Sequence, residues 1–307
     1  MLSLLNCSDS IINFHIIHSS EEEKYFLSQK ILQHHNIGKV NVYKFKNPNS
    51  IKFENLTDAH VTEATYYRLF IDKYLDKTIQ QLIYIDCDIV CVNNPLQNIK
   101  NQFEKLTQSE FTIGAVPEYI GSDGEHINIF HKELDLESKD YFNAGVMLID
   151  YQKWLKNNLG KHLLETMLEL KGIIKYWDQD VLNKFFDGKY LKLLEGMNKK
   201  FNNINHLNKI TLDEISKKGS TTYFIHFAGK FKPWHIRGCV LTGSSLFQDV
   251  FLELNSYKPF IQIRNRRNAI NQLLSLSFFK NLLNQKNKTN TLIHIFYRII
   301  FKSKAEK

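Results

Sequence analysis

Two carboxylates, one residue apart, come directly after an apolar run in the first third of the sequence. The run QLIYI ends at residue 85, and Asp86 and Asp88 follow it. In open α/β sheets, ligands bind beyond the carboxyl ends of the strands. Two hard oxygen donors at such a place suit Mg²⁺ or Mn²⁺ holding a diphosphate. The alternative is a solvated aspartate pair in a turn, which the apolar run reaching right up to Asp86 weakens but does not remove.

Polar residues also border two later elements. Asn143 and the turn-former Gly145 stand just before a buried apolar run, and Asp178 and Asp180 open a helical pattern. Each has an ordinary structural explanation. An asparagine beside a strand is usually a turn or cap residue, and aspartates in a first helical turn act as caps and favour the helix dipole.

A fourth cluster follows the apolar run TYFIH. His226 ends that run, and Gly229 and Lys232 come shortly after it. Histidine can supply a nitrogen ligand to Mn²⁺, glycine permits close backbone approach, and lysine can neutralise a phosphate. A single histidine at a strand end is usually structural, but that explanation fits the whole cluster less well.

Strands and helices must alternate to position these residues. Strands are predicted at 10–17, 40–45, 81–85, 111–116, 145–149 and 222–226, and helices at 21–35, 64–74, 151–170 and 178–186. This order predicts an α/β fold with a mainly parallel sheet flanked by helices.

Positive charge is concentrated at the C-terminal end. The chain has a formal net charge of +8, with 40 Lys and Arg against 32 Asp and Glu. Residues 261–307 hold ten of these bases and one acid, so that segment is +9 and the other 260 residues are −1. The total alone suggests an anionic partner. A nucleic-acid binder is disfavoured, because the bases are confined to the tail and no nucleic-acid module is recognisable.

The tail combines these bases with regularly spaced apolar residues. Ile270, Leu274, Phe278 and Leu282 recur four apart, which predicts basic amphipathic helices at a membrane surface. No apolar run reaches the about 18 residues that a spanning helix needs. The four cysteines form no spaced framework and no zinc pattern, which favours reduced thiols in a cytosolic protein.

Taken together, the motifs IDCDIV, YFNAGVMLI, WDQDVLN and HFAGKFKPWH resemble the retaining glycosyltransferases of family 8, in the branch that builds bacterial lipopolysaccharide cores. The resemblance covers roughly residues 5–260. It implies a Rossmann-like fold of the GT-A type and a UDP-sugar bound with Mn²⁺ (or Mg²⁺). The implied domains are a transferase domain at 1–260 and a membrane-associating tail at 261–307.

The resemblance also implies roles for particular residues. The expected metal ligands are Asp86, Asp88 and His226. The expected donor-binding residues are His60, Arg68, Asn143, Asp178, Gln179, Gly229 and Lys232. The expected catalytic residues are Asp178, Gln179 and Asp180.

The implied activity is transfer of glucose or galactose from its UDP-sugar to a lipopolysaccharide core acceptor, by an enzyme on the inner face of the bacterial inner membrane. One departure is that the family's first strand, with its uridine-contacting aspartate, has no counterpart before residue 10. This departure predicts weak UDP binding and poor solubility. It also supports an alternative, in which the chain is a truncated, non-catalytic, membrane-associated remnant.

Overall fold

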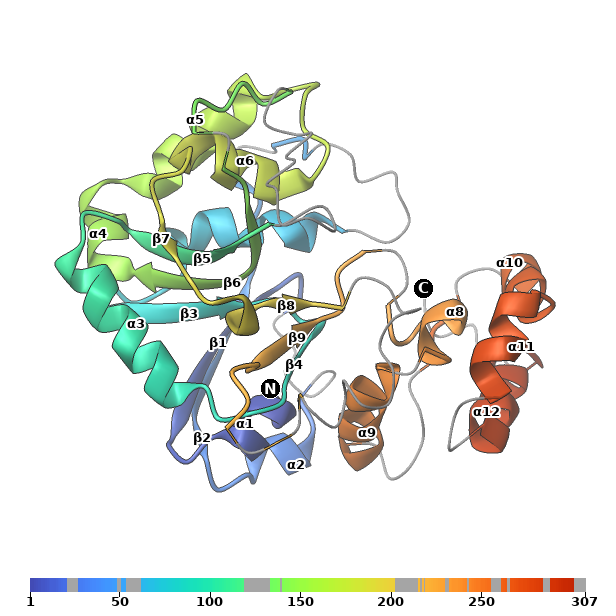
Figure 1. Cartoon of the computed structure of the whole chain (residues 1–307). Coiled ribbons are helices and arrows are strands. Elements are labelled where there is room, and N and C mark those ends of the chain that lie inside the picture. Colours follow the sequence, from blue (N-terminus) through green and yellow to red (C-terminus); the bar gives the residue numbers. More distant parts are fainter. Residues whose placement is uncertain are drawn as a thin grey trace.

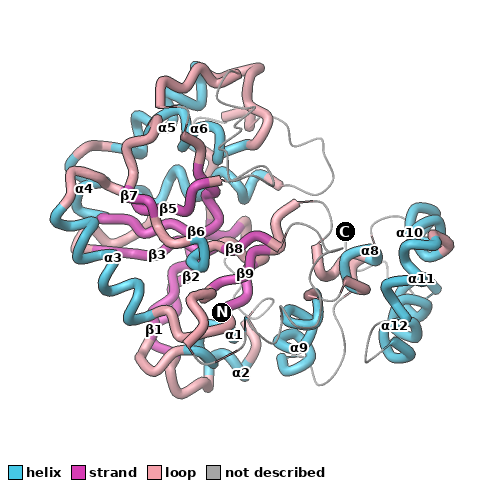
Figure 2. Tube along the Cα trace, in the orientation of Figure 1, coloured by secondary structure: helices cyan, strands magenta, loops and turns pink. Residues whose placement is uncertain are grey.

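The computed structural model describes residues 1–20, 27–48, 51–53, 62–118, 133–138, 140–201, 215, 217, 219–229, 232–241, 243–254, 261–263, 266–283 and 288–300. Strands lie at the centre and helices surround them (Figures 1 and 2). The strands are β1 (Ile12–His18), β2 (Ile37–Lys44), β3 (Gln81–Ile85), β4 (Ile89–Cys91), β5 (Ile113–Pro117), β6 (Phe142–Asp150), β7 (Leu191–Lys192), β8 (Lys199–Lys200) and β9 (Phe224–His226). This arrangement confirms the predicted α/β class.

The described strands pair in three groups: β1-β2, β3-β6-β5-β7 and β4-β9-β8. The sheets are mixed rather than mainly parallel. Strand β6 runs antiparallel to both β3 and β5, and β4 runs antiparallel to β9, whereas the other ladders are parallel. All nine residues of β6 are buried. That explains its continuous apolar run, since a strand covered on both faces has no polar alternation.

The helices flank these strands. They are α1 (Leu2–Cys7), α2 (Gln29–Leu32), the 3₁₀ segment η3 (Glu63–Lys73), α3 (Leu96–Gln108), α4 (Tyr151–Lys156), α5 (Leu159–Glu169), α6 (Trp177–Phe186), η4 (Glu195–Met197), α8 (Ile236–Cys239), α9 (Ser244–Leu254), α10 (Arg266–Leu273), α11 (Leu276–Leu283) and α12 (Lys288–Ile300). The helices α3 and α9 were not predicted from the pattern of apolar residues in the sequence.

Two predicted helices are interrupted. The helix expected at 151–170 is divided between α4 and α5, because Asn158 has φ +49°, a left-handed conformation that asparagine tolerates better than most residues. The helix expected at 64–74 is a 3₁₀ segment with a kink at Phe70. Of the helix expected at 21–35, residues 21–26 lie outside the described part, and α2 covers only Gln29–Leu32.

The core is built in layers around β6. One large cluster joins η3, β5, β6, α5 and α6, and a second joins β4, α3, β6 and β9 on the other side.

The C-terminal helices α10, α11 and α12 gather at one end of the molecule beside α8 (Figure 1). They share a separate cluster with α8 that includes Ile236, Val240, Leu273, Phe278 and Ile295. No helix in the described ranges is both long and apolar enough to cross a bilayer.

Candidate active site

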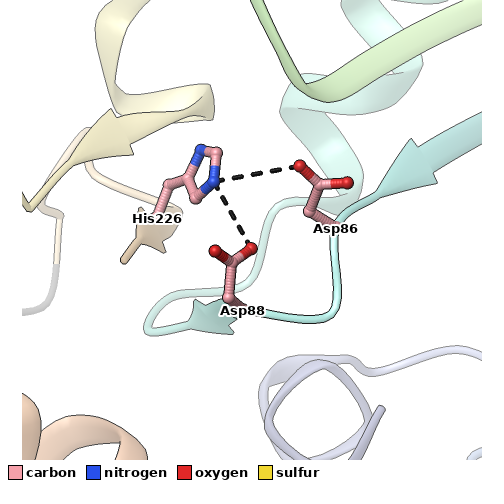
Figure 3. Close-up of side chains that lie close together, drawn as sticks. All are labelled: Asp86, Asp88 and His226. Carbon is pink, nitrogen blue, oxygen red and sulfur yellow. Dashed lines mark ion pairs between the residues drawn. The ribbon is translucent and has the colours of Figure 1, made fainter. Parts of the chain in front are cut away.

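Asp86 and Asp88, from the short connection between β3 and β4, meet His226, which is far away in the sequence (Figure 3). Asp86 follows β3, Asp88 precedes β4, and His226 ends β9. Each offers one ligand atom, and these atoms lie within 4.8 Å of one another. His226 Nε2 lies 3.4 Å from Asp88 Oδ1 and 3.9 Å from Asp86 Oδ2. Two carboxylates and one imidazole form a donor set that suits Mn²⁺, so the residues fit a divalent cation.

The ring of His226 is pressed against the backbone of β6. A Cβ built on Gly145 would lie 2.3 Å from His226 Cε1 and 2.5 Å from Nδ1. Gly145 is therefore not a turn residue before the strand, as its type suggested, but a residue inside β6 that leaves room for the imidazole. The strand begins at Phe142, three residues earlier than predicted.

Arg68 ties the metal group to α6. Its guanidinium lies 2.6 Å from Asp86 Oδ1 and 2.7 Å from Asp178 Oδ2, and it also donates to the carbonyl of Ala144. The guanidinium carbon stands 4.0 Å from the ring centroid of Tyr84, and Tyr84 Oη donates to Asp86 Oδ1 at 2.7 Å. The Arg68 side chain is only 5% exposed, so both of these carboxylates depend on it for their charge balance.

The predicted catalytic residues open α6. Trp177 begins the helix with φ +52°, a strained conformation for a bulky side chain. Asp178 follows, and burial raises its pKa to about 6, although Arg68 and the Thr65 hydroxyl oppose the shift. The Thr65 hydroxyl donates to Asp178 Oδ1 at 2.6 Å. Sequence reasoning missed Thr65 and Tyr84.

Gln179 and Asp180 are held by neighbours. Gln179 Oε1 accepts the Ala144 N–H at 3.1 Å, and its amide donates to Tyr141 Oη at 3.2 Å. Tyr141 donates in turn to Asp180 Oδ1 at 2.6 Å, while Asp180 Oδ2 accepts the backbone N–H groups of Lys175 and Tyr176. Asp180 is therefore buried, and both of its carboxylate oxygens accept hydrogen bonds from within the protein. This geometry is that of a residue that positions its neighbours.

The raised pKa of Asp178 predicts a pH-dependent stability difference between the protein and an Asp178→Asn variant. The unfolded chain titrates near the ordinary value of 3.8 and the folded one near 6, so the folded state binds more protons between these values. Stability is then lost as the pH rises. Relative to the variant, we expect the free energy of unfolding to fall by about 3 kcal/mol from pH 3.5 to 7. Urea titrations of both proteins would measure this. A difference that stays flat or rises with pH would mean that Arg68 outweighs burial.

The other predicted donor-binding residues are placed as follows. Lys232 contacts Asp88 Oδ2, and burial, which alone would raise the pKa of Asp88, is outweighed by His226 and Lys232, which lower it. Gly229 follows β9 with φ +86°, a conformation that favours glycine.

The side chain of Asn143 forms hydrogen bonds within the protein, to Glu118, Gly145 and Asn198. His60 lies outside the described residues.

Sequence reasoning also missed two further residues at this site. Tyr141 contacts both Gln179 and Asp180, and Asn198 lies 3.0 Å from His226 Nδ1 through its Oδ1. Tyr141 stood inside a quoted motif, and its buried hydroxyl needs a partner. Asn198 stands in the run EGMNKK, which has no periodic pattern, so only the fold brings it to the site.

The same fold occurs in a solved glycosyltransferase. The crystal structure of the galactosyltransferase LgtC in complex with donor and acceptor sugar analogues aligns with a TM-score of 0.65, covering 82% of this chain and 89% of that one. At 23% identity the likeness shows the fold alone. The architecture is that of the GT-A type of glycosyltransferase.

The chain belongs to glycosyltransferase family 8, because the model of "Glycosyl transferase family 8" matches residues 2–238. It is 26% identical over 245 residues to a lipopolysaccharide 1,2-glucosyltransferase of Escherichia coli K12, covering 76% of this chain and 66% of the relative. It is 28% identical over 250 residues to a lipopolysaccharide 1,3-galactosyltransferase of Salmonella typhimurium, covering 79% and 68%. This chain therefore spans about two thirds of these relatives.

Proposed function

We propose that this protein transfers glucose or galactose from a UDP-sugar to a lipopolysaccharide core acceptor, with retention of configuration and with Mn²⁺. The observation that carries the proposal is the meeting of Asp86, Asp88 and His226 beside Arg68 and Asp178, in a family 8 fold. The similarity to lipopolysaccharide glucosyl- and galactosyltransferases supports the choice of sugar and acceptor.

The charges at the site suit cleavage of a sugar–phosphate bond. A bound divalent cation would supply a Lewis acid for the negative charge that develops on the diphosphate. Lys232, held between Asp88 and the Phe227 carbonyl, adds a fixed positive charge where the leaving group forms. Asp178, next to Arg68, offers a buried negative charge to the sugar, which becomes positive in the transition state. This polarity matches the proposed reaction.

Retention of configuration at the sugar requires either a protein nucleophile or attack by the acceptor on the same face from which the leaving group departs. Gln179 is the amide that the resemblance offers as a nucleophile. Its Oε1 already accepts the Ala144 N–H, and an amide is a weak nucleophile in any case. This contact supports front-face attack, in which the leaving phosphate accepts the proton of the acceptor hydroxyl. The amide of Gln179 then serves to orient the sugar.

The proposal is tested with the full chain and radiolabelled UDP-glucose or UDP-galactose. We expect hydrolysis or transfer with Mn²⁺, its loss on chelation, and its return when Mn²⁺ is restored. Asp88→Asn should be inactive, whereas Asp9→Asn, at an exposed position near the N-terminus, should match wild type. Equal activity of Asp88→Asn and wild type would contradict the assigned site. A wild-type chain that turns over neither donor would favour the non-catalytic alternative.

The C-terminal helices carry apolar side chains in solvent, and we propose that these contact an anionic membrane. Leu274 directly follows α10 and lies four residues after Ile270, with its N–H bonded to the Ile270 carbonyl. Phe279 and Leu283 lie four apart on α11. All four side chains are exposed, Leu274 by 71% and Leu283 by 68%. Residues four apart share one side of a helix. Exposed apolar stripes in a segment of charge +9 fit an anionic bilayer surface, where each base adds about 1 kcal/mol.

A double variant, Leu274→Ser with Leu283→Ser, tests this contact. It leaves the buried cluster shared with α8 intact, which a deletion of the segment would not. We expect weaker sedimentation with vesicles that contain phosphatidylglycerol, because the inserted apolar area is lost. Leu168→Ser, at a position on α5 that is 56% exposed, should bind like wild type. Unchanged binding of the double variant would contradict membrane contact through these residues.

A further inference from the structure

A run of hydrogen-bonded polar side chains leads away from the proposed metal ligand His226, and the function proposed above assigns no role to Asn198 within it. It passes from Lys200 and Glu118 through Asn143 to Asn198, and ends at His226. Asn198 is 2% exposed, Asn143 6% and His226 5%. Buried polar groups are costly unless each finds a partner, so the direction of every hydrogen bond in this run can be determined by elimination.

The direction of the hydrogen bonds is fixed first at Asn143. The backbone N–H of Gly145 can only donate, and it lies 3.0 Å from Asn143 Oδ1. The Glu118 carboxylate, which is paired with Lys200, can only accept, and its Oε2 lies 3.1 Å from Asn143 Nδ2. A donor must face an oxygen and an acceptor must face the amide nitrogen. The Asn143 side chain therefore has one orientation.

That orientation fixes the next two groups. Asn198 approaches Asn143 Oδ1 at 2.7 Å, so its Nδ2 must point there and donate. Its Oδ1 then faces His226 Nδ1 at 3.0 Å. An amide oxygen can only accept, so Nδ1 must carry the proton and donate it. The proton of a histidine ring is assigned from such partners and not seen directly, and here the assignment follows from a backbone N–H and a carboxylate.

We propose that Asn198 is a positioning residue that holds His226 in the tautomer protonated at Nδ1, which directs the unprotonated Nε2 toward Asp86 and Asp88. The inference rests on the proposed metal site, because a histidine binds a metal only through a nitrogen without a proton. The close approach of Gly145 fixes the plane of the same ring. The hydrogen bond between Nδ1 and Asn198 leaves Nε2 as the nitrogen without a proton. The contact with Gly145 sets the direction in which Nε2 points.

Nitrogen NMR of the full chain, labelled with ¹⁵N-histidine and free of metal, reads the tautomer directly. The signals of His226 are those lost in His226→Gln. Once the pH is high enough that the spectrum shows only one protonated ring nitrogen, we expect that nitrogen to be Nδ1 and the unprotonated one to be Nε2. Asn198→Ala should lose this pattern, and Asn198→Asp should keep it, since a carboxylate also accepts from Nδ1. The reverse pattern in wild type, or no change in Asn198→Ala, would overturn the proposal.

Titration with Mn²⁺ alone, following the free ion by its EPR signal, gives a second readout. Loss of a partner behind a metal ligand weakens metal binding by about 10- to 100-fold, so we expect that loss in Asn198→Ala. We expect a smaller loss in Asn198→Asp, whose carboxylate still accepts from Nδ1 but cannot donate to Asn143 Oδ1. The matched control is Asn36→Ala, because Asn36 is 7% exposed and donates to the carbonyls of Leu5 and Ser8, away from the site. Equal Mn²⁺ affinity of Asn198→Ala and wild type would overturn the proposal.

The two readouts separate this inference from the function on which it rests. The tautomer is measured without metal or sugar, so the spectrum decides the role of Asn198 even in a protein that transfers nothing. A wild-type chain that shows the expected tautomer and binds no Mn²⁺ would contradict the proposed metal dependence and support the hydrogen-bonded run. Should Asn198→Ala fail to fold, the wild-type and Asn198→Asp spectra still decide the outcome.

Discussion

Substituting Gly145 by alanine is expected to weaken Mn²⁺ binding by at least tenfold and to slow sugar transfer about 100-fold. The added Cβ would overlap the ring of His226, at 2.3 Å from Cε1. The strand has little freedom to yield, because β6 pairs with β3 on one side and β5 on the other, and the Gly145 carbonyl accepts the N–H of Asp86 at 2.8 Å. The imidazole must therefore move, and its Nε2 leaves the position facing the two aspartates.

The matched control is Gly114→Ala, in the neighbouring strand β5. A Cβ there would meet the end of the Leu193 side chain at 3.1 Å, and a flexible leucine can shift by the few tenths of an ångström required. We expect Mn²⁺ affinity and transfer close to wild type for Gly114→Ala. Overpacking costs about 1–3 kcal/mol, so thermal unfolding should show that Gly145→Ala still folds. Wild-type Mn²⁺ affinity in Gly145→Ala would show that the ring does not depend on the glycine.

The contrast between Gly145 and Asp86 shows what a sequence can and cannot reveal about this site. Asp86 and Asp88 were identifiable because a strand ending in carboxylates has a direct chemical meaning. Gly145 was also noticed, but it was assigned to a turn, because its true constraint is a histidine 81 positions later that packs against it. Such a constraint exists only once the fold brings His226, at the end of β9, against β6.

The mixed pairing of the sheet was hidden for a similar reason. An apolar run such as β6 predicts burial on both faces, and burial of that kind is usual in parallel sheets. The direction of a strand, however, depends on how its connections run, and the residues between β5 and β6 carry no periodic signal that would reveal it. The same holds for Asn198 and Thr65, which are ordinary polar residues until the fold brings them against His226 and Asp178.

Replacing Arg68 by methionine is expected to destabilise the protein by about 3–5 kcal/mol, because it leaves buried carboxylates without their counter-charge. The guanidinium is the shared partner of Asp86 and Asp178, and Asp178 is 3% exposed. Sugar transfer should fall about 10³-fold, since the positive charge beside the proposed diphosphate site is lost. Urea denaturation and initial rates measure the two effects, with Lys105→Met, at an exposed position on α3, as the control expected to stay within about 0.5 kcal/mol.

A second substitution separates the two roles of Arg68. In the double variant Arg68→Met with Asp178→Asn, the most deeply buried unpaired charge is gone, so much of the lost stability should return, and the two substitutions should be non-additive because their side chains are in contact. Activity should not return, because neither the positive charge nor the carboxylate that we propose to face the sugar is restored. Recovery of both stability and transfer would mean that Arg68 only neutralises Asp178. Recovery of neither would mean that Asp86, which is 23% exposed and still lacks its arginine partner, governs the loss.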